Sequence, residues 1–85
     1  MGSMTSAEIY SANLRIFMAA KNITATELAK RAGISRNSVN LARKEHRKMI
    51  KFSTIDSIAK ALKIPVYRFF QVPKAYLIKE ERHVE

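Results

Sequence analysis

The stretch from residue 24 to residue 44, TATELAKRAGISRNSVNLARK, constrains the fold of this chain more than any other. Its apolar residues recur at helical spacing on both sides of Gly33, which predicts two short helices joined by a sharp turn. The residues expected to face inward are Leu28, Ala29, Ala32, Ile34, Val39 and Ala42. Those expected to face outward on the second helix are Arg36, Asn37, Ser38, Asn40, Leu41 and Lys44. A helix with an apolar inner side and a polar, basic outer side can lie in the major groove of DNA.

Short-range signals define both helices of this unit. Thr24 is predicted to cap the first helix, and Glu27 three residues later completes a capping box. Gly33 stands where the helix must stop and the chain must turn, a position that favours a residue tolerating positive φ. Ser35 is predicted to cap the second helix, so its first turn, beginning at Arg36, directs free backbone N–H groups outward.

Positive charge is concentrated on and just after this unit. The formal net charge is +9 at pH 7, and residues 30–51 carry eight Lys or Arg and a single Glu. Such a patch favours a polyanion through counterion release. The alternative is a solvated basic face with no partner. A membrane-surface helix fits less well, because no broad stripe of bulky apolar residues opposes the basic ones.

The remaining segments predict further helices around the unit. The first runs from an N-cap at Ser6 to about Lys21, with Asn22 in a left-handed conformation, and buries Ile9, Tyr10, Leu14, Phe17 and Met18. Residues 44–52 predict a basic loop. Ser53 or Thr54 then caps a fourth helix that buries Ile55, Ile58, Ala59 and Leu62, with Phe52 as a hydrophobic staple. Pro65 opens a short fifth helix with Val66, Phe69 and Phe70 inward.

The boundaries follow from composition. Residues 1–3 are interpreted as an expression remnant, residues 4–71 as one domain, and residues 72–85 as a tail that forms either an edge strand or a helix and is a candidate dimerisation element. Cysteine is absent, and no apolar run approaches the roughly 20 residues that span a bilayer. We therefore expect a cytoplasmic protein with no membrane association, no disulfide and no thiolate metal site.

The stretch from about Leu14 to Phe70, two thirds of the chain, resembles the lambda-repressor/Cro-type helix-turn-helix family, also called the XRE family. The resemblance rests on Thr24, Glu27-Leu28-Ala29, Gly33-Ile34-Ser35-Arg36, Val39, Ile58-Ala59-Lys60-Ala61-Leu62 and Phe69-Phe70. It implies an all-α bundle of about five helices that binds operator DNA, typically as a homodimer on a palindromic site. Two departures stand out: Ala25 stands where many members have a Gln that supports a base contact, and Arg43 adds positive charge where an acidic residue often sits.

The outer face supplies the candidate DNA-binding residues. Arg36 matches guanine O6 and N7, Asn37 matches adenine N6 and N7, and Leu41 suits a thymine methyl group. The full set of predicted base readers is Arg36, Asn37, Asn40 and Leu41. The predicted phosphate contacts are Thr24, Thr26, Ser35, Ser38, Lys44, Arg47 and Lys48. For each of these residues the alternative is ordinary surface polarity or helix capping.

These observations favour a sequence-specific transcriptional regulator of double-stranded DNA, of the phage or plasmid repressor type. An antitoxin or a restriction-modification controller would share the same features, with a protein partner on the C-terminal tail. A protein-interaction module that does not bind DNA is a further alternative, although it predicts a less basic outer face. We expect no enzyme, cofactor or metal site, because a Gly-rich phosphate loop, a cysteine nucleophile and a cluster of metal ligands are all missing from the sequence.

Overall fold

The structure is a computed structural model that describes residues 4–44 and 50–73. The elements in order are α1 (Ser6–Ala20), α2 (Ala25–Ala32), α3 (Arg36–Arg43), α4 (Phe52–Leu62) and the 3₁₀ helix η1 (Val66–Phe70). No strand occurs within these two ranges, so the all-α prediction is confirmed. The expected remnant at residues 1–3, most of the basic loop and most of the tail lie outside the described residues.

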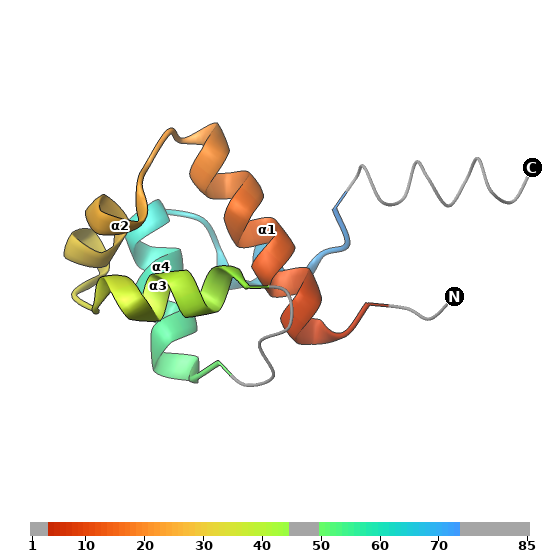
Figure 1. The fold of residues 1–85 in the computed structure, drawn as a ribbon. Helices are drawn as coiled ribbons and strands as arrows, with labels where there is room; N and C mark the ends of the chain where they lie inside the picture. Colours follow the sequence, from red (N-terminus) through yellow and green to blue (C-terminus); the bar gives the residue numbers. More distant parts are fainter. Residues whose placement is uncertain (1–3, 45–49, 74–85) are drawn as a thin grey trace, which may run out of the picture.

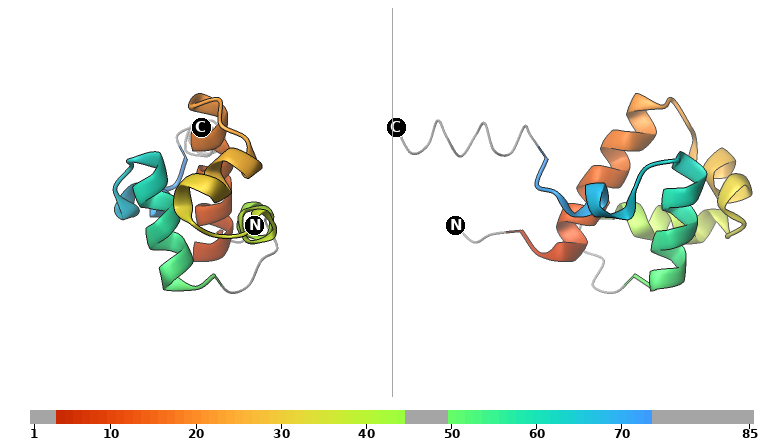
Figure 2. Two further views of the ribbon diagram at one scale, coloured as in Figure 1. Left: turned by 90° about the vertical axis from the view of Figure 1, so that its left-hand side faces the viewer. Right: turned by 180° about the vertical axis from the view of Figure 1, so that it is seen from behind.

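The helices form a compact bundle in which α1 connects its two ends (Figure 1). At one end, α2 and α3 pack against each other, and α2 also rests on α4. At the other end, η1 lies against α1, behind α3 in the view of Figure 1 and in front of α1 when the molecule is seen from behind (Figure 2). Helix α1 therefore contacts both α3 and η1.

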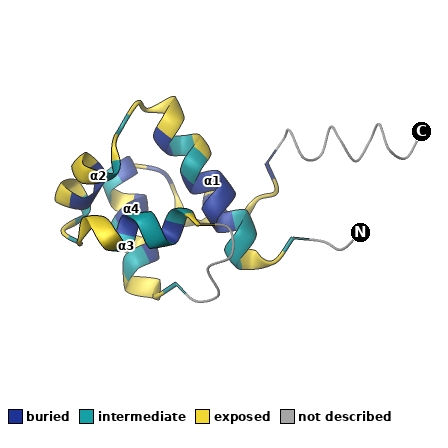
Figure 3. Cartoon of the chain, viewed as in Figure 1, coloured by how far each residue is buried: buried dark blue, intermediate teal, exposed yellow. Residues whose placement is uncertain are grey.

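The core draws on every element. Its fully buried large side chains are Tyr10, Leu14, Leu28, Val39, Ile58, Leu62 and Phe69. The ring of Phe69 stacks on Tyr10, with centroids 5.2 Å apart, and meets Phe17 edge-on at 5.0 Å. Figure 3 shows the burial concentrated where the helices face one another. Burial raises the pKa of the Tyr10 phenol, because the charged form is poorly solvated there.

The predicted start of α1 was wrong by one residue. Thr5, not Ser6, is the N-cap: its backbone is extended, and its Oγ1 accepts a hydrogen bond from the Glu8 N–H at 3.1 Å. The Glu8 carboxylate accepts one from the Thr5 N–H at 2.8 Å in return. Spacing fixes this choice, since only Thr5 has a Glu three residues later to complete a capping box.

The predicted start of α4 was also wrong. The helix begins at Phe52 with Lys51 as its N-cap, and no side chain caps it. The backbone explains this start, because the Lys51 carbonyl already accepts the first helical hydrogen bond from the Ile55 N–H at 3.0 Å. Phe52 is 85% exposed and does not act as a buried hydrophobic staple. The predicted inner face of α4, by contrast, is confirmed by the burial of Ile55, Ile58, Ala59 and Leu62.

The predicted fifth helix is a single 3₁₀ segment preceded by Pro65. Of its three predicted inward residues only Phe69 is fully buried, while Val66 and Phe70 remain partly exposed. Side chains three residues apart share one side of a 3₁₀ helix, so Phe70, which directly follows the buried Phe69, lies on another side. Asn13 on α1 holds the segment through its Nδ2, which donates to the carbonyls of Phe69 at 2.8 Å and Gln71 at 2.7 Å.

Three helix ends adopt the left-handed conformation. Gly33 has φ 71°, and the non-glycine residues Asn22 and Lys63 have φ 52° and 58°. The predictions for Gly33 and Asn22 are thereby confirmed. A Cβ on Gly33 would meet nothing within 4 Å, so the requirement for glycine there comes from the backbone conformation alone.

We predict that Gly33→Ala lowers the free energy of unfolding by about 1–2 kcal/mol, because a Cβ is disfavoured in the left-handed region. Lys63→Gly is the matched reverse change at a helix end of the same type, and it should leave stability equal or raised. Urea unfolding followed by circular dichroism measures both. Equal stability of Gly33→Ala and the unmodified protein would contradict the assignment of strain to this corner.

Candidate nucleic-acid interface

Helix α2 begins at the predicted cap. Thr24 Oγ1 accepts a hydrogen bond from the Glu27 N–H at 3.1 Å. The second half of the predicted capping box is not formed among the described residues, because the Glu27 carboxylate instead binds Arg31 Nη2 at 2.9 Å. This pair spans one helical turn on an exposed surface and adds only a few tenths of a kcal/mol to stability, by the usual i,i+4 magnitude of ~0.3–0.5 kcal/mol.

The corner between α2 and α3 is a glycine-ended helix followed at once by a new cap. The Ile34 N–H donates to the Ala29 carbonyl at 3.1 Å, which closes the last turn of α2. Ser35 Oγ then accepts from the Ser38 N–H at 3.0 Å and starts α3, as predicted. Helix α2 therefore ends at the corner and does not run through Gly33, so the two helices form a helix-turn-helix.

The two sides of α3 differ in burial as the sequence predicts. Val39 and Ala42 are buried against the core, whereas Arg36, Asn37 and Lys44 are exposed. The other outward predictions, Ser38, Asn40 and Leu41, are half-buried. In Figure 3 the start of α3 is coloured as exposed and its far end, near α1, as buried or intermediate. The N-terminal turn of α3 is thus the part most available to a partner.

The remaining inward predictions hold to different degrees. Leu28 and Ala29 on α2 are buried, while Ala32 and Ile34 at the corner are half-buried. Ile34 still packs against the core cluster. The corner therefore lies at the edge of the core.

The C-terminal end of α3 is held by side chains of α1 that the sequence did not reveal. The buried Ser11 Oγ donates toward the carbonyls of Ala42 at 2.7 Å and Lys44 at 3.0 Å. Arg15 Nη1 donates to the carbonyl of Arg43. The last carbonyls of a helix have no partner within that helix, so these contacts satisfy them and fix the end of α3 on α1.

Two side-chain pairs lie along α3 itself. Ser35 Oγ and Ser38 Oγ are 2.9 Å apart, and Arg43 Nη2 donates to Asn40 Oδ1 at 2.6 Å. Arg43 was noted in the sequence only as added charge and was not among the candidate site residues. Its spacing of three from Asn40 on a helix is the signal that would have linked the two.

The described candidate phosphate contacts lie on α2 and α3 or at their ends. Thr24, Thr26 and Ser35 are exposed, and Thr24 and Ser35 stand at the N-termini of α2 and α3. The positive ends of both helix dipoles thus lie at exposed residues, Thr24 for α2 and Ser35 for α3. Arg47 and Lys48 fall outside the described residues.

Other kinds of site find no support in the part of the chain that the structure describes. No three His, Cys, Asp or Glu side chains there gather as metal ligands. Within residues 4–44 and 50–73, every helix falls short of the length and apolar character that crossing a membrane requires.

We predict that Ser11→Ala lowers the free energy of unfolding by about 1–3 kcal/mol, because it leaves buried carbonyls at the end of α3 without a hydrogen bond. Ser6→Ala is the matched control: Ser6 is an exposed serine of the same helix, and its loss should change stability by less than about 0.5 kcal/mol. Urea midpoints measured by circular dichroism compare the two. Indistinguishable midpoints would show that the Ser11 contact does not stabilise the fold.

Several solved structures are similar to this chain over most of its length. A hypothetical transcription factor, NHTF, from Neisseria aligns with a TM-score of 0.73 and 27% identity, over 88% of this chain and 83% of that one. The clp gene regulator ClgR from Corynebacterium glutamicum aligns with a TM-score of 0.70 and 26% identity, over 80% of this chain and 71% of that one. Protein 11 of prophage Lp1 aligns with a TM-score of 0.67 and 28% identity, over 85% of this chain and 95% of that one. A comparison with curated proteins yields no match.

The sequence itself matches a family model. The model of the Cro/C1-type helix-turn-helix DNA-binding domain covers residues 13–66, which include α2, the corner at Gly33, all of α3 and α4. This range contains the capped, glycine-ended unit whose second helix exposes Arg36 and Asn37. The chain belongs to the Cro/C1-type helix-turn-helix family of DNA-binding transcription regulators.

Proposed function

We propose that this protein is a sequence-specific repressor of the phage type that binds a palindromic operator as a homodimer, with α3 of each copy in the major groove. One observation carries the proposal: α3 buries Val39 and Ala42 while leaving Arg36 and Asn37 exposed at its N-terminal turn. N-terminal residues of a recognition helix are the ones that reach base edges. The similarity to a prophage protein over 85% of the chain supports the phage assignment.

In this proposal the outer face of α3 reads the bases. The Arg36 guanidinium suits the two acceptors of guanine, and the Asn37 amide suits the donor and acceptor of adenine. Leu41, half-buried one turn beyond Asn37, offers an apolar surface to a thymine methyl group. Asn40 lies beside Leu41 and is the fourth reader.

The phosphate contacts come from the rim of the same surface. The exposed Thr24, Thr26, Ser35 and Lys44, with the half-buried Ser38, are proposed to bind the DNA backbone. The N-termini of α2 and α3 add backbone N–H groups at the same positions. These contacts fix the orientation of α3 and do not distinguish one base from another. Base selection is left to the readers, such as Arg36 and Asn37. The same role is proposed for Arg47 and Lys48 of the basic loop.

A dimer follows from the size of the module. One such domain buries only about 600–1,000 Å² on DNA, whereas two copies on half-sites roughly 34 Å apart double the contacts. Excepting Phe52, the large exposed apolar side chains in the described ranges are Ile16, Val66, Tyr67, Phe70 and Val72. They belong to α1 and residues 66–72, toward the end of the molecule away from α2 (Figures 1 and 2). A second copy on this apolar face leaves both α3 helices free.

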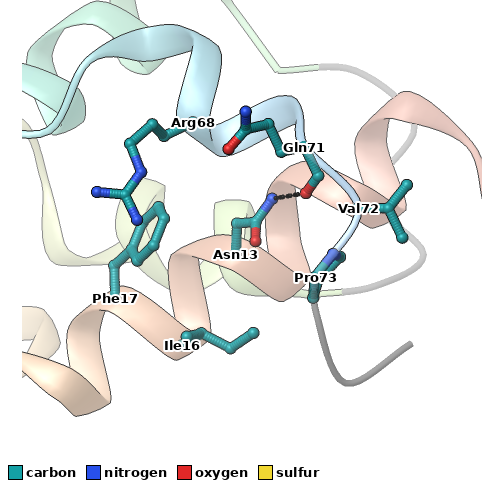
Figure 4. A pocket seen from close by; sticks show the side chains of 7 residues that line it. All are labelled: Asn13, Ile16, Phe17, Arg68, Gln71, Val72 and Pro73. Carbon is teal, nitrogen blue, oxygen red and sulfur yellow. Dashed lines mark hydrogen bonds between the residues drawn. The ribbon is translucent and has the colours of Figure 1, made fainter. Parts of the chain in front are cut away.

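A groove is lined by two of these residues, Ile16 and Val72. It has a volume of about 530 Å³ and lies between α1 and the chain after η1, lined by Asn13, Ile16, Phe17, Arg68, Gln71, Val72 and Pro73 (Figure 4). Arg68 lies over the Phe17 ring, 5.4 Å from its centroid, at one wall of the groove. Tyr76, Leu77 and Ile78 of the tail lie outside the described residues and are proposed to add apolar area to the dimer. Repression then needs only that the bound dimer exclude other proteins from the same DNA.

We predict that Arg36→Ala and Asn37→Ala each weaken binding to the selected operator by about 1–3 kcal/mol, roughly 5- to 150-fold, and relax preference at one base pair. Lys44→Ala should weaken operator and random duplex alike and reduce the slope of log K against log salt by about 0.9. Selection of bound duplexes from a random pool, followed by titrations at two salt concentrations, tests all three. Lys60→Ala, an exposed cation on α4, is the charge control. If every variant lost the same affinity for the operator and for random duplex, the division into base readers and phosphate contacts would be refuted.

We predict that Tyr67→Glu and Val72→Glu convert a dimer into a monomer, because each places a charge in the apolar face. Phe52→Glu is the matched control, since Phe52 is more exposed than Tyr67, at 85% against 64%, but lies at the start of α4. Sedimentation velocity over a range of concentrations gives the oligomeric state. A purely monomeric unmodified protein that still binds a palindromic site tightly would overturn the dimer interface proposed here.

A further inference from the structure

The hydrogen bond between Arg43 and Asn40 fixes which atoms Asn40 shows to solvent. Arg43 Nη2 donates to Asn40 Oδ1 at 2.6 Å, and both side chains are half-buried on α3. A guanidinium carries five N–H donors and no acceptor, so the amide oxygen, and not the amide nitrogen, must face it. The hydrogen bond from Arg43 therefore fixes the orientation of the Asn40 amide.

Asn40 and Arg43 share one line along α3 with the proposed base reader Arg36. Residues 36, 40 and 43 are spaced i, i+4 and i+7, so their side chains lie above one another on the same helix face. Seven residues rise about 10 Å along a helix, within the roughly 12 Å width of the major groove. A helix placed to let Arg36 read bases therefore carries the Asn40–Arg43 pair over the same DNA.

The backbone beneath this pair is anchored. The Arg43 carbonyl accepts from Arg15, and the neighbouring carbonyls of Ala42 and Lys44 accept from Ser11. The end of α3 is thereby tied to α1, and Arg43 is held within one turn of Asn40. Binding then loses less side-chain freedom than it would with two independent side chains, which is how preorganisation raises affinity.

The pair differs from a free asparagine in what it offers to a base. A free Asn offers one acceptor and one donor, which suits adenine. In the pair, Arg43 takes one of the two lone pairs of the oxygen, and an adenine amino group approaching the other would meet the guanidinium charge. What remains exposed is the Asn40 Nδ2–H and the other guanidinium N–H groups, all donors. Among the four bases, guanine presents two adjacent acceptors, N7 and O6, in the major groove.

We infer that Asn40 and Arg43 form one composite donor that selects guanine at a single position of the half-site, and that Arg43 keeps Asn40 from selecting adenine. The inference rests on the proposed function, because it requires α3 in the major groove. It makes Arg43 a specificity-determining residue in addition to the proposed readers.

The test uses the full chain and repeats the selection of bound duplexes with three variants. Asn40→Asp keeps an acceptor for Arg43 but removes the amide donor, so guanine preference at one position should fall by about 5- to 150-fold. Arg43→Ala frees the Asn40 oxygen, so preference at that position should shift from guanine toward adenine. Lys60→Ala, which removes an exposed charge on α4, is the control and should change no base preference. Circular dichroism confirms that each variant is folded.

The outcomes separate this inference from the proposed function. If the unmodified protein binds selected and random duplexes equally, the proposed function fails and the composite donor fails with it. If the protein is selective but Arg43→Ala weakens every duplex equally and leaves each base preference in place, Arg43 is a phosphate anchor and only the composite donor is refuted. The composite donor is also refuted if the unmodified protein prefers adenine at the base position whose preference changes in Asn40→Asp. A shift from guanine to adenine in Arg43→Ala supports it, because a purely structural role would not exchange one base for another.

Discussion

The burial of one side of α3 is the constraint on which the rest of the structure depends. Eight residues form too short a helix to be stable alone, so α3 exists only through its packing against α2 and α1. Val39 and Ala42 supply that packing, and they fix the rotation of α3 about its own axis. This rotation directs the side chains of Arg36 and Asn37 into solvent. The exposed, basic start of α3 is thus a consequence of the core.

Helix α1 adds the second constraint, which sets the position of α3 along its axis. Ser11 and Arg15 bind the carbonyls at the end of α3, and Asn13 on the same helix binds those of the segment after Pro65. Hydrogen bonds have stricter geometry than apolar contacts, so they specify one register where packing alone tolerates small shifts. The end of α3 and the segment after Pro65 are therefore both held by one helix. The position of these two segments relative to each other is set by α1.

Sequence reasoning succeeded where the signal is local and failed where it is distant. The cap at Thr24, the corner at Gly33 and the cap at Ser35 each depend on residues within four positions, and the structure confirms all three. Ser11, Asn13 and Arg15 bind carbonyls 28 to 58 residues away, and nothing in a helical pattern marks such partners. The errors at the starts of α1 and α4 have another origin. At α1 the capping box of Thr5 and Glu8 outweighs Ser6 as the cap. At α4 no side chain caps the helix, so no cap residue in the sequence marks its start.

The same contrast applies to reading base preference from a recognition helix. Matching Asn to adenine and Arg to guanine treats each side chain as free to offer all its donors and acceptors. On a helix of two turns, residues three or four apart are neighbours, so a charged side chain can occupy the atom that its neighbour would use. Asn40 is in that position, whereas Asn37, exposed at the start of α3, makes no such contact with the residues that the structure describes. Two asparagines on one face of one helix can therefore select different bases, because the difference lies in what each is bonded to before DNA arrives.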